Sequence, residues 1–387
     1  MILCMSFSCT RKESMKSLIA DRLNRSAEQY LSMAEALVSQ PDKLPRTFEH
    51  DKLVTSNSAW WCSGFMPGTL WYLYQYTNDA VLLEYATEYT GRIEKEQYNK
   101  GTHDLGFMLY CSYGNGLRLT GNEAYRSILL TGAESLISRY NPVVGCIKSW
   151  NSNAKWQFPV IIDNMMNLEF LLWASNASGD PKFKDVCLSH ADKTIKNHYR
   201  PDYSSYHVVS YDTITGLPEK KNTHQGFSDN SAWARGQAWG LYGYVMMYRE
   251  TKNPAYLNWA KGIAGFIIDH PNLPEDKIPY WDFDAPGIPN AERDASAGAI
   301  IASALIELSA FVDKDLADKY IKTAECQLRT LSSPDYFAEA GTNGHFILKH
   351  SVGHLMGKSE VDAPLTYADY YYVEALLRFN DLILKKK

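Results

Sequence analysis

Apolar side chains recur every three or four residues over most of the chain, which is the spacing of helices that bury one face. In the first such segment, residues 14–38, they fall at Met15, Leu18, Ile19 and Leu23 and continue in the same way. The clearest strand-like alternation is residues 206–211, in the long connection from residue 200 to residue 230. The pattern therefore predicts an all-α protein.

Short polar turns divide this helical pattern at regular intervals. They begin at residues 77, 120, 178, 251 and 312, and each brings a capping residue or a proline to the start of a new amphipathic helix. Successive turns lie 43, 58, 73 and 61 residues apart, about 59 on average. That interval is one helical hairpin with its loop.

The two helices of each hairpin differ in composition. The segments before the turns are rich in aromatic residues and glycine, as in residues 60–76 and 233–248, whereas those after the turns carry more charge. About twelve helices in six hairpins, with apolar inner and amphipathic outer members, predict a closed α/α toroid formed by one domain from residue 13 to residue 387. An open solenoid of helix pairs is the alternative, but a solvated concave face would not hold bulky aromatics.

Composition excludes several functions. Net charge is −5 and no block of Lys and Arg occurs, which disfavours nucleic acid as a partner. No stretch of about 20 apolar residues is present to span a membrane. The seven cysteines show no C-x-x-C pair, which argues against a disulfide framework or a zinc site. The 10 Trp and 26 Tyr suit either a large core or a wet, sugar-binding cleft.

The first twelve residues allow two interpretations. They are short for a signal peptide, but small residues before Cys9 are similar to the end of a bacterial lipoprotein signal, in which the cysteine becomes lipidated. The alternative is an irregular terminus. The first interpretation predicts a periplasmic, lipid-anchored protein, and the second leaves a cytoplasmic location open.

Two acidic residues stand at the expected starts of inner helices. Asp104 and Asp163 are 59 residues apart, which is one hairpin period, so both should face the same cavity mouth. Helix capping is the commoner role for an Asp in such a place. However, Ile161 and Ile162 give Asp163 an apolar setting, which should favour its protonated form, and two carboxyls in unlike environments can supply an acid and a charge partner.

Further candidates are aromatic or basic. Arg235 lies among small and aromatic residues on an inner helix, where it must pair with a protein carboxylate or with an anionic ligand, and Trp239 follows on the same face. Stacking against a sugar or burial in the core is expected of three other aromatic residues, Trp61, Phe65 and Trp150.

One pair of histidines has the spacing of a metal site. His350 and His354 are four residues apart, but Val352 and Gly353 make a helix doubtful there and no acid lies between them. We therefore expect no metal at this pair. No phosphate-binding glycine loop and no G-x-S-x-G motif occur, which disfavours nucleotide binding and serine hydrolase chemistry.

Three motifs together resemble the unsaturated glucuronyl hydrolases, glycoside hydrolase family 88. They are HDLGF at 103–107, IDNMMNL at 162–168 and QGFSDNSAWARGQAW at 225–239, and the resemblance continues from about residue 60 to the C-terminus, including RDASAGA at 293–299. The long third motif is specific. The resemblance implies an (α/α)6 barrel, in agreement with the hairpin count, and an enzyme that removes a 4,5-unsaturated uronic acid from the non-reducing end of lyase-generated oligosaccharides.

The resemblance also implies roles for individual residues. Asp163 matches the general acid and base that protonates C4 of the vinyl ether and helps to deliver water to C5, and Asp104 matches the second essential acid. Uronate-binding positions are matched by His207, Gln225, Arg235 and Trp239, and aromatic contacts by Trp61, Phe65 and Trp150. His103, His350 and Ser351 are further expected substrate contacts. No metal or organic cofactor is implied.

Two alternatives remain at this stage. The unsaturated rhamnogalacturonyl hydrolases share the fold and the chemistry but act on pectin fragments, and a helical-repeat protein could bind carbohydrate without catalysis. Some family members carry an aromatic residue where this chain has residues 351–354, which we expect to border the next sugar. The preferred glycosaminoglycan and its sulfation therefore stay open.

Overall fold

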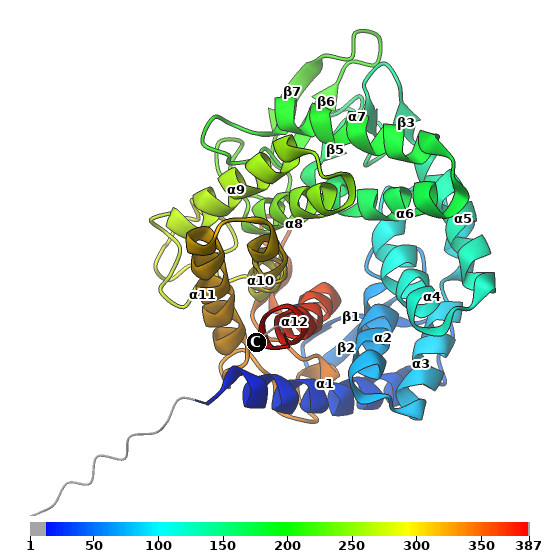
Figure 1. The fold of residues 1–387 in the computed structure, drawn as a ribbon, viewed down its shortest axis with the longest axis vertical. Coiled ribbons are helices and arrows are strands. Elements are labelled where there is room, and N and C mark those ends of the chain that lie inside the picture. The colour runs from blue at the N-terminus through cyan, green and yellow to red at the C-terminus, as the bar shows by residue number, and fades with distance from the viewer. Residues whose placement is uncertain (1–12, 386–387) are drawn as a thin grey trace, which may run out of the picture.

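The computed structural model describes residues 13–385 and is built mainly of helices (Figure 1). The N-terminal residues 1–12 lie outside this range, so the predicted lipid attachment at Cys9 stays a prediction. The α-helices are α1 (Met15–Leu37), α2 (Phe65–Thr77), α3 (Ala80–Gly91), α4 (Asn115–Thr120), α5 (Glu123–Ile137), α6 (Leu168–Ser178), α7 (Pro181–His198), α8 (Ala234–Thr251), α9 (Pro254–Asp269), α10 (Ala295–Leu308), α11 (Lys314–Leu331) and α12 (Thr366–Phe379). Short helical turns add η1 (Glu94–Tyr98), η2 (Gly106–Gly114, π-helical), η3 (Ile162–Asn167), η4 (Ser309–Phe311), η5 (Asn343–His345) and η6 (Asn380–Leu384).

Six helical segments form a closed inner ring. Around the ring α2 contacts η2, and then η2 with α6, α6 with α8, α8 with α10, α10 with α12 and α12 again with α2 are neighbours. The helices α3, α5, α7, α9 and α11 lie outside their hairpin partners, and α1 packs on α12, α2 and α3 (Figure 1). The predicted (α/α)6 barrel is confirmed, and the sixth hairpin joins the first helix of the chain to the last.

The polar turns between the helices have the expected capping chemistry. The side chains of Asp79, Asn122, Asp180, Asn253 and Asp313 each accept a hydrogen bond from a backbone N–H in the first turn of the following helix. These bonds satisfy donors that have no partner within the helix. Local sequence therefore fixes where each outer helix begins.

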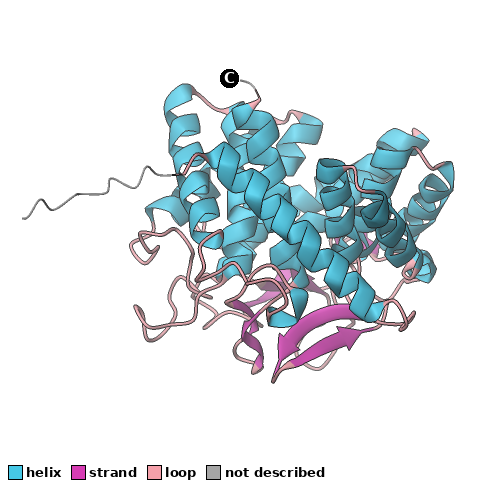
Figure 2. Ribbon diagram, turned by 90° about the horizontal axis from the view of Figure 1, so that it is seen from below, coloured by secondary structure: helices cyan, strands magenta, loops and turns pink. Residues whose placement is uncertain are grey.

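The strands gather at one end of the barrel (Figure 2). They are β1 (Leu44–Glu49), β2 (Lys52–Ser56), β3 (Tyr140–Asn141), β4 (Cys146–Ile147), β5 (Pro159–Ile161), β6 (Val208–Tyr211), β7 (Pro218–Asn222), β8 (Ser351–His354) and β9 (Ser359–Ala363). All pairings are antiparallel: β1 with β2, β3 with β4, β8 with β9, and β6 between β5 and β7. The strand predicted at residues 206–211 is confirmed as β6, and this end of the barrel carries the N-termini of the inner helices.

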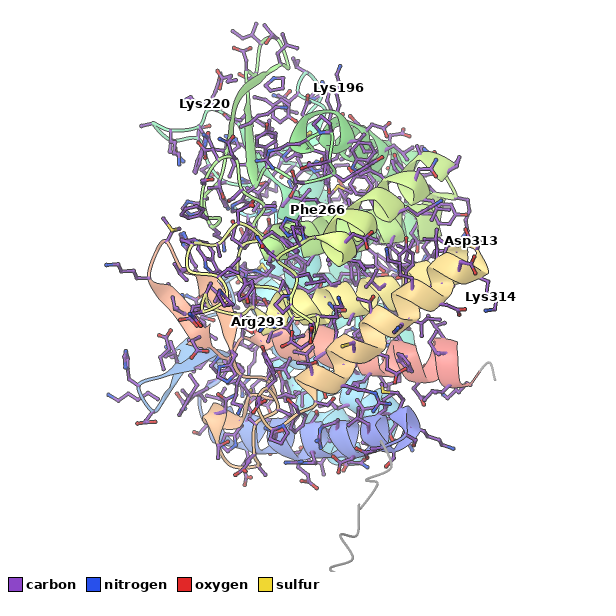
Figure 3. The ribbon with its side chains drawn as sticks, turned by 90° about the vertical axis from the view of Figure 1, so that its left-hand side faces the viewer. Lys196, Lys220, Phe266, Arg293, Asp313 and Lys314 are labelled. Atoms are coloured by element: carbon purple, nitrogen blue, oxygen red, sulfur yellow. The ribbon has the colours of Figure 1, made fainter. Side chains whose placement is uncertain are left out.

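Inner and outer helices differ in burial as their composition predicts. All 14 residues of α10 are buried, whereas α11, on the outside, buries only one stripe. Charged side chains such as Lys196, Lys220 and Lys314 are exposed on the outside of the molecule (Figure 3). Within the described residues, no helix is long and apolar enough to cross a membrane.

Two glycines allow a test of the inner and outer layers. A Cβ atom on Gly243, in inner helix α8, would lie 2.5 Å from Cβ of Met165, whereas one on Gly265, in outer helix α9, would meet no atom within 4 Å. Gly243→Ala should lower the free energy of unfolding by about 1–3 kcal/mol through overpacking. Gly265→Ala should raise it by about 0.5–1 kcal/mol, because alanine loses less backbone entropy on folding. Chemical denaturation of both variants measures this, and equal effects would contradict the layer assignment.

Candidate active site

Asp163 lies where the short sheet meets the inner ring. It is in η3, directly after β5 and before α6, and the backbone N–H of Ile162 donates to the carbonyl oxygen of His207 (3.1 Å), which extends the pairing of β5 with β6. The Asp163 side chain caps no helix. The commoner capping role is therefore wrong for this residue, and the β5–β6 pairing places Asp163 beside His207.

The Asp163 carboxyl is buried without a hydrogen-bond partner for Oδ2. The residue is 8% exposed, and Oδ2 lies 3.7 Å from Nε2 of His207. Burial raises the pKa of Asp163 to about 7, against the opposing charge of Arg235, and the carboxylate of Asp104 raises the pKa further. The predicted preference for the protonated form is confirmed, with the physical cause that the apolar flank implied.

His207 faces this carboxyl with a fixed ring orientation. Its Nδ1 accepts the backbone N–H groups of His224 (3.2 Å) and Gln225 (3.1 Å), so in the neutral ring the hydrogen is on Nε2, toward Asp163. Burial holds the pKa of His207 well below its usual value. A neutral Nε2–H donor with no partner of its own thus lies beside an unpartnered carboxyl oxygen.

Asp104 reaches the same region from the turn before η2. Oδ2 accepts the hydroxyl of Thr102 (2.7 Å), and Oδ1 lies 3.3 Å from Nε2 of His103. His103 in turn contacts Asn164, the neighbour of Asp163, with 2.7 Å between Nδ1 and Oδ1. The contact of His103 with Asn164 brings the segments of the two acids together, while their shared cavity mouth stays a prediction, and Asp104, like Asp163, is not a helix cap.

Arg235 has a protein partner, which was one of its two expected roles. It is 1% exposed, and its Nη1 donates to Asp294 (3.0 Å), while Nη2 donates to the carbonyl oxygen of Gly353 (2.7 Å). Its guanidinium also lies over the rings of Trp233 (4.5 Å) and Tyr367 (5.3 Å). Arg235 therefore ties α8 to α10 and β8, and its charge acts on Asp163 from a fixed position.

The candidate aromatic residues fall into two layers. Trp61 and Trp150 are half-buried, and Trp150 lies edge-on to His207 at 5.9 Å. Phe65 is fully buried, with its ring centroid 5.9 Å from that of Trp61 and 5.3 Å from that of Phe107. It is therefore a core residue, the second of its two expected roles, and it packs against Trp61. Trp239 is also fully buried, and the interaction of its side chain with Asp163 lowers the pKa of that carboxyl.

The remaining candidates lie on β8, directly before it, and in the loop after β7. Gln225 donates from Nε2 to the carbonyl oxygen of Gly353 (2.9 Å), and His354 contacts the carbonyl oxygen of His224 through Nε2 (3.0 Å). His350 forms an ion pair with Asp362 (2.6 Å), and its side chain is 42% exposed. Ser351 is fully buried with an unpartnered hydroxyl. The two histidines thus have separate partners, and residues 13–385 contain no group of three or more His, Cys, Asp or Glu side chains placed to hold a metal.

Two supporting residues were not predicted individually. Asp294 is the true helix cap at this end, because its Oδ1 accepts the backbone N–H of Ser296 (3.0 Å) while Oδ2 holds Arg235. Asn164 holds His103. Both Asp294, at the start of α10, and Asn164, directly after Asp163, are present in the sequence motifs. Their partners, however, lie far away in the sequence.

Comparison with known proteins identifies the family of this chain. The model of Glycosyl Hydrolase Family 88 matches residues 33–381. The chain belongs to this family. An unsaturated glucuronyl hydrolase of Formosa agariphila is 48% identical over 327 residues, 84% of this chain and 81% of that protein.

Solved structures show the same fold. One, described as an unsaturated glucuronyl hydrolase specific for heparin, has a TM-score of 0.92 and 48% identity over 96% of this chain and 99% of its own. A mutant of a Streptococcus agalactiae unsaturated glucuronyl hydrolase in complex with dGlcA-GalNAc6S has a TM-score of 0.81 and 28% identity, covering 96% of this chain and 93% of its own. The chain is a glycoside hydrolase.

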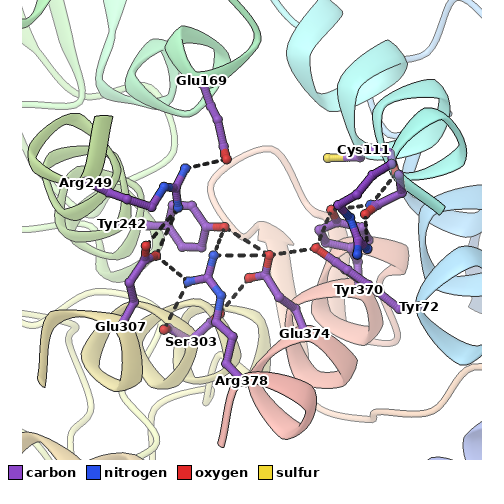
Figure 4. Close-up of polar contacts among 12 residues, drawn as sticks. Tyr72, Cys111, Glu169, Tyr242, Arg249, Ser303, Glu307, Tyr370, Glu374 and Arg378 are labelled. Carbon is purple, nitrogen blue, oxygen red and sulfur yellow. Dashed lines mark hydrogen bonds and ion pairs between the residues drawn. The ribbon is translucent and has the colours of Figure 1, made fainter. Parts of the chain in front are cut away.

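This family 88 enzyme has a cavity of about 420 Å³ among its inner helices. Its charged side chains pair with one another: Arg249 with Glu169 and Glu307, and Arg378 with Glu307 and Glu374 (Figure 4). Glu374 also accepts the hydroxyls of Tyr72, Tyr242 and Ser303. This network therefore connects five inner helices, α2, α6, α8, α10 and α12, through ion pairs and hydrogen bonds.

The buried carboxyl predicts a pH-dependent penalty in stability. The folded-state pKa of Asp163 is about 7, above the usual 3.8, so its contribution to stability is lost as the pH rises from the lower to the higher value. Asp163→Asn removes this loss. The free energy of unfolding of the variant should gain on the wild type by about 3 kcal/mol between pH 5 and pH 8.

Asp369 provides the matched control for this measurement. Burial raises its pKa to about 7 as well, but its carboxyl oxygens accept the backbone N–H groups of Ile347 (3.0 Å) and Leu348 (2.8 Å). Asp369→Asn places an amide NH₂ against one of these donors and should destabilise the fold at both pH values. A loss of stability in both variants would contradict the assignment of Asp163 as an unpartnered carboxyl.

Proposed function

We propose that this enzyme removes the 4,5-unsaturated uronic acid from the non-reducing end of lyase-generated glycosaminoglycan oligosaccharides. The observation that carries the proposal is the buried carboxyl of Asp163, whose Oδ2 has no hydrogen-bond partner and whose pKa of about 7 lets it hold a proton at neutral pH. The family and the names of the related enzymes support the same substrate class.

In the proposed mechanism Asp163 is both acid and base. Its proton is transferred to C4 of the vinyl ether, and the resulting carboxylate accepts a proton from the water that adds to C5. The hemiketal at C5 opens and releases the second sugar. His207 donates from Nε2 to the substrate or to Asp163. Trp239 donates its indole N–H to the carboxyl of Asp163, and the rings of Trp61 and Trp150 stack on the sugar rings.

The direct test follows the ultraviolet absorbance of the conjugated uronate. Absorbance should fall when the enzyme is added to lyase-generated disaccharides from heparin or chondroitin. A panel of sulfated and unsulfated disaccharides identifies the preferred substrate. Turnover of pectin-derived unsaturated disaccharides alone would replace the proposal with rhamnogalacturonyl hydrolysis, and binding without loss of absorbance would replace it with a carbohydrate-binding function.

Asp163→Asn should abolish turnover in a folded protein. The amide has the same shape but cannot give up a proton, and general acid and base catalysis contributes roughly 10²–10⁴-fold. We expect kcat to fall by at least that range with KM changed much less, measured by absorbance on the preferred disaccharide. Near-normal kcat in the variant would show that another group protonates C4.

The pH profile should show that Asp163 acts in its protonated form. Since the pKa of Asp163 is about 7 in the free enzyme, kcat/KM should be highest on the acidic side and fall as the pH rises through that value. Bound substrate adds a carboxylate beside Asp163, so the alkaline limb of kcat should lie at higher pH than that of kcat/KM. A rate that increases through pH 7 would contradict the acid role.

A further inference from the structure

His103 lies behind the second carboxyl and links it to the segment of Asp163. The histidine is buried, 1% exposed, with Nδ1 against Oδ1 of Asn164 (2.7 Å) and Nε2 against Oδ1 of Asp104 (3.3 Å). Among residues 13–385, His103 is the one basic side chain in ion-pair contact with Asp104. The protonation of His103 therefore decides the net charge that His103 and Asp104 together present to the substrate.

Asn164 determines which nitrogen of His103 carries a hydrogen. Its Nδ2 donates to the carbonyl oxygen of Ile147 (2.7 Å) and to Oγ of Ser149 (3.1 Å). A carbonyl oxygen only accepts, so the amide nitrogen must face Ile147, and Oδ1 is left to accept from His103. Nδ1 of His103 is thus the protonated nitrogen, and in the neutral ring Nε2 has a lone pair.

The lone pair on Nε2 of His103 faces the carboxyl of Asp104, whose position is fixed by hydrogen bonds. Asp104 cannot turn away freely, because the hydroxyl of Thr102 donates to its Oδ2 (2.7 Å) and accepts its backbone N–H (3.1 Å). A bare Nε2 and a bare carboxylate oxygen 3.3 Å apart would repel each other in a buried site. One proton between them changes this repulsion into attraction.

The neighbouring charges do not replace this proton. Arg139, at the end of α5, donates to the backbone carbonyl oxygens of Lys100, Lys148 and Ser149. Burial of the ring lowers the pKa of His103 below its usual value; Asp104 and the contact with Asn164 raise it in part, and the charge of Arg139 lowers it slightly. The charges of Asp163 and Arg235 act from η3 and α8, and the buried His190, on α7, is a neutral neighbour whose Nδ1 accepts the N–H of Ile147 (3.1 Å).

We propose that His103 is a positioning residue that shares one proton with Asp104. The proton is carried on Nε2 of His103 and lies toward Oδ1 of Asp104, so that the imidazolium and the carboxylate together have no net charge. The second carboxyl therefore faces the substrate as part of a neutral pair and not as a lone anion.

The consequence for catalysis rests on the proposed function. The substrate brings a carboxylate to Asp163, and a lone anion at Asp104 would raise the pKa of Asp163 still further. Neutralising Asp104 through His103 limits this rise, so Asp163 can still lose its proton to C4 and recover one from water near neutral pH. His103 thus acts on the acid through Asp104.

The first test is independent of any substrate. NMR of the full-length enzyme labelled with ¹⁵N-histidine reports the protonation of each ring nitrogen, and His103→Asn assigns the signal. We expect a protonated Nδ1, and an Nε2 that keeps its proton to higher pH in the wild type than in Asp104→Asn. A bare Nδ1, or an Nε2 that titrates identically in both proteins, would overturn the proposal.

The second test separates a structural role from the proton-sharing role. In His103→Asn the amide can replace Nδ1 against Asn164 but leaves Asp104 alone, and in His103→Gln the amide can reach the Nε2 position but cannot titrate. Both variants should lower kcat by about tenfold or more, equivalent to about 1.4 kcal/mol of activation free energy, and move the alkaline limb of kcat/KM to higher pH. The melting temperature checks that each variant is folded.

His190→Asn is the matched control. This variant changes a buried histidine beside β4 that makes no contact with Asp104. The alkaline limb of the kcat/KM profile should therefore stay at the same pH. An unmoved limb in the two His103 variants would overturn the proposal. If the wild-type enzyme turns over no unsaturated disaccharide, the proposed function fails, while the NMR result still decides whether the proton is shared.

Discussion

The site depends on one unfavourable feature, a carboxyl group held away from water without a partner for Oδ2. The protein could have avoided this by turning Asp163 into a helix cap, as it does with Asp294 two hairpins later. Instead, β5 ends in a tight helical turn, and the backbone hydrogen bond from Ile162 to His207 fixes the segment of Asp163 beside the segment of His207. The proton on Asp163 at neutral pH is a direct result of this geometry.

The opposite end of the barrel shows how the same fold treats charge when no chemistry is required. There the buried Glu307 and Glu374 and the half-buried Glu169 pair with Arg249 and Arg378, and hydroxyl groups complete the network (Figure 4). A fully satisfied network of this kind keeps the inner helices in one arrangement. At the end that carries the strands, by contrast, Oδ2 of Asp163 and Nε2 of His207 are buried without a hydrogen-bond partner.

The strands of this mainly helical protein position the polar groups of the site. Inner helices point their N-termini at one end of the barrel, and segments from distant parts of the sequence meet there: β6 brings His207, the loop after β7 brings Gln225, and β8 supplies the carbonyl oxygen of Gly353 to both Gln225 and Arg235. The helices therefore provide a rigid ring, while the strands and loops set the positions of the polar groups. Differences in substrate among related enzymes can arise in these segments without any change to the ring.

Sequence by itself determined the helical hairpins, because apolar periodicity and capping chemistry act within a few residues of each other. It also placed Asp104 and Asp163 at equivalent points of successive hairpins, and the two isoleucines before Asp163 indicated a raised pKa. Only the tertiary structure decided that α12 closes the ring against α2 with α1 packed outside them, that Phe65 is core while Trp61 is half-buried, that Arg235 pairs with Asp294, and that Asn164 orients His103. Those outcomes depend on which distant groups compete for the same donor or the same space, and a one-dimensional pattern contains no distances between them.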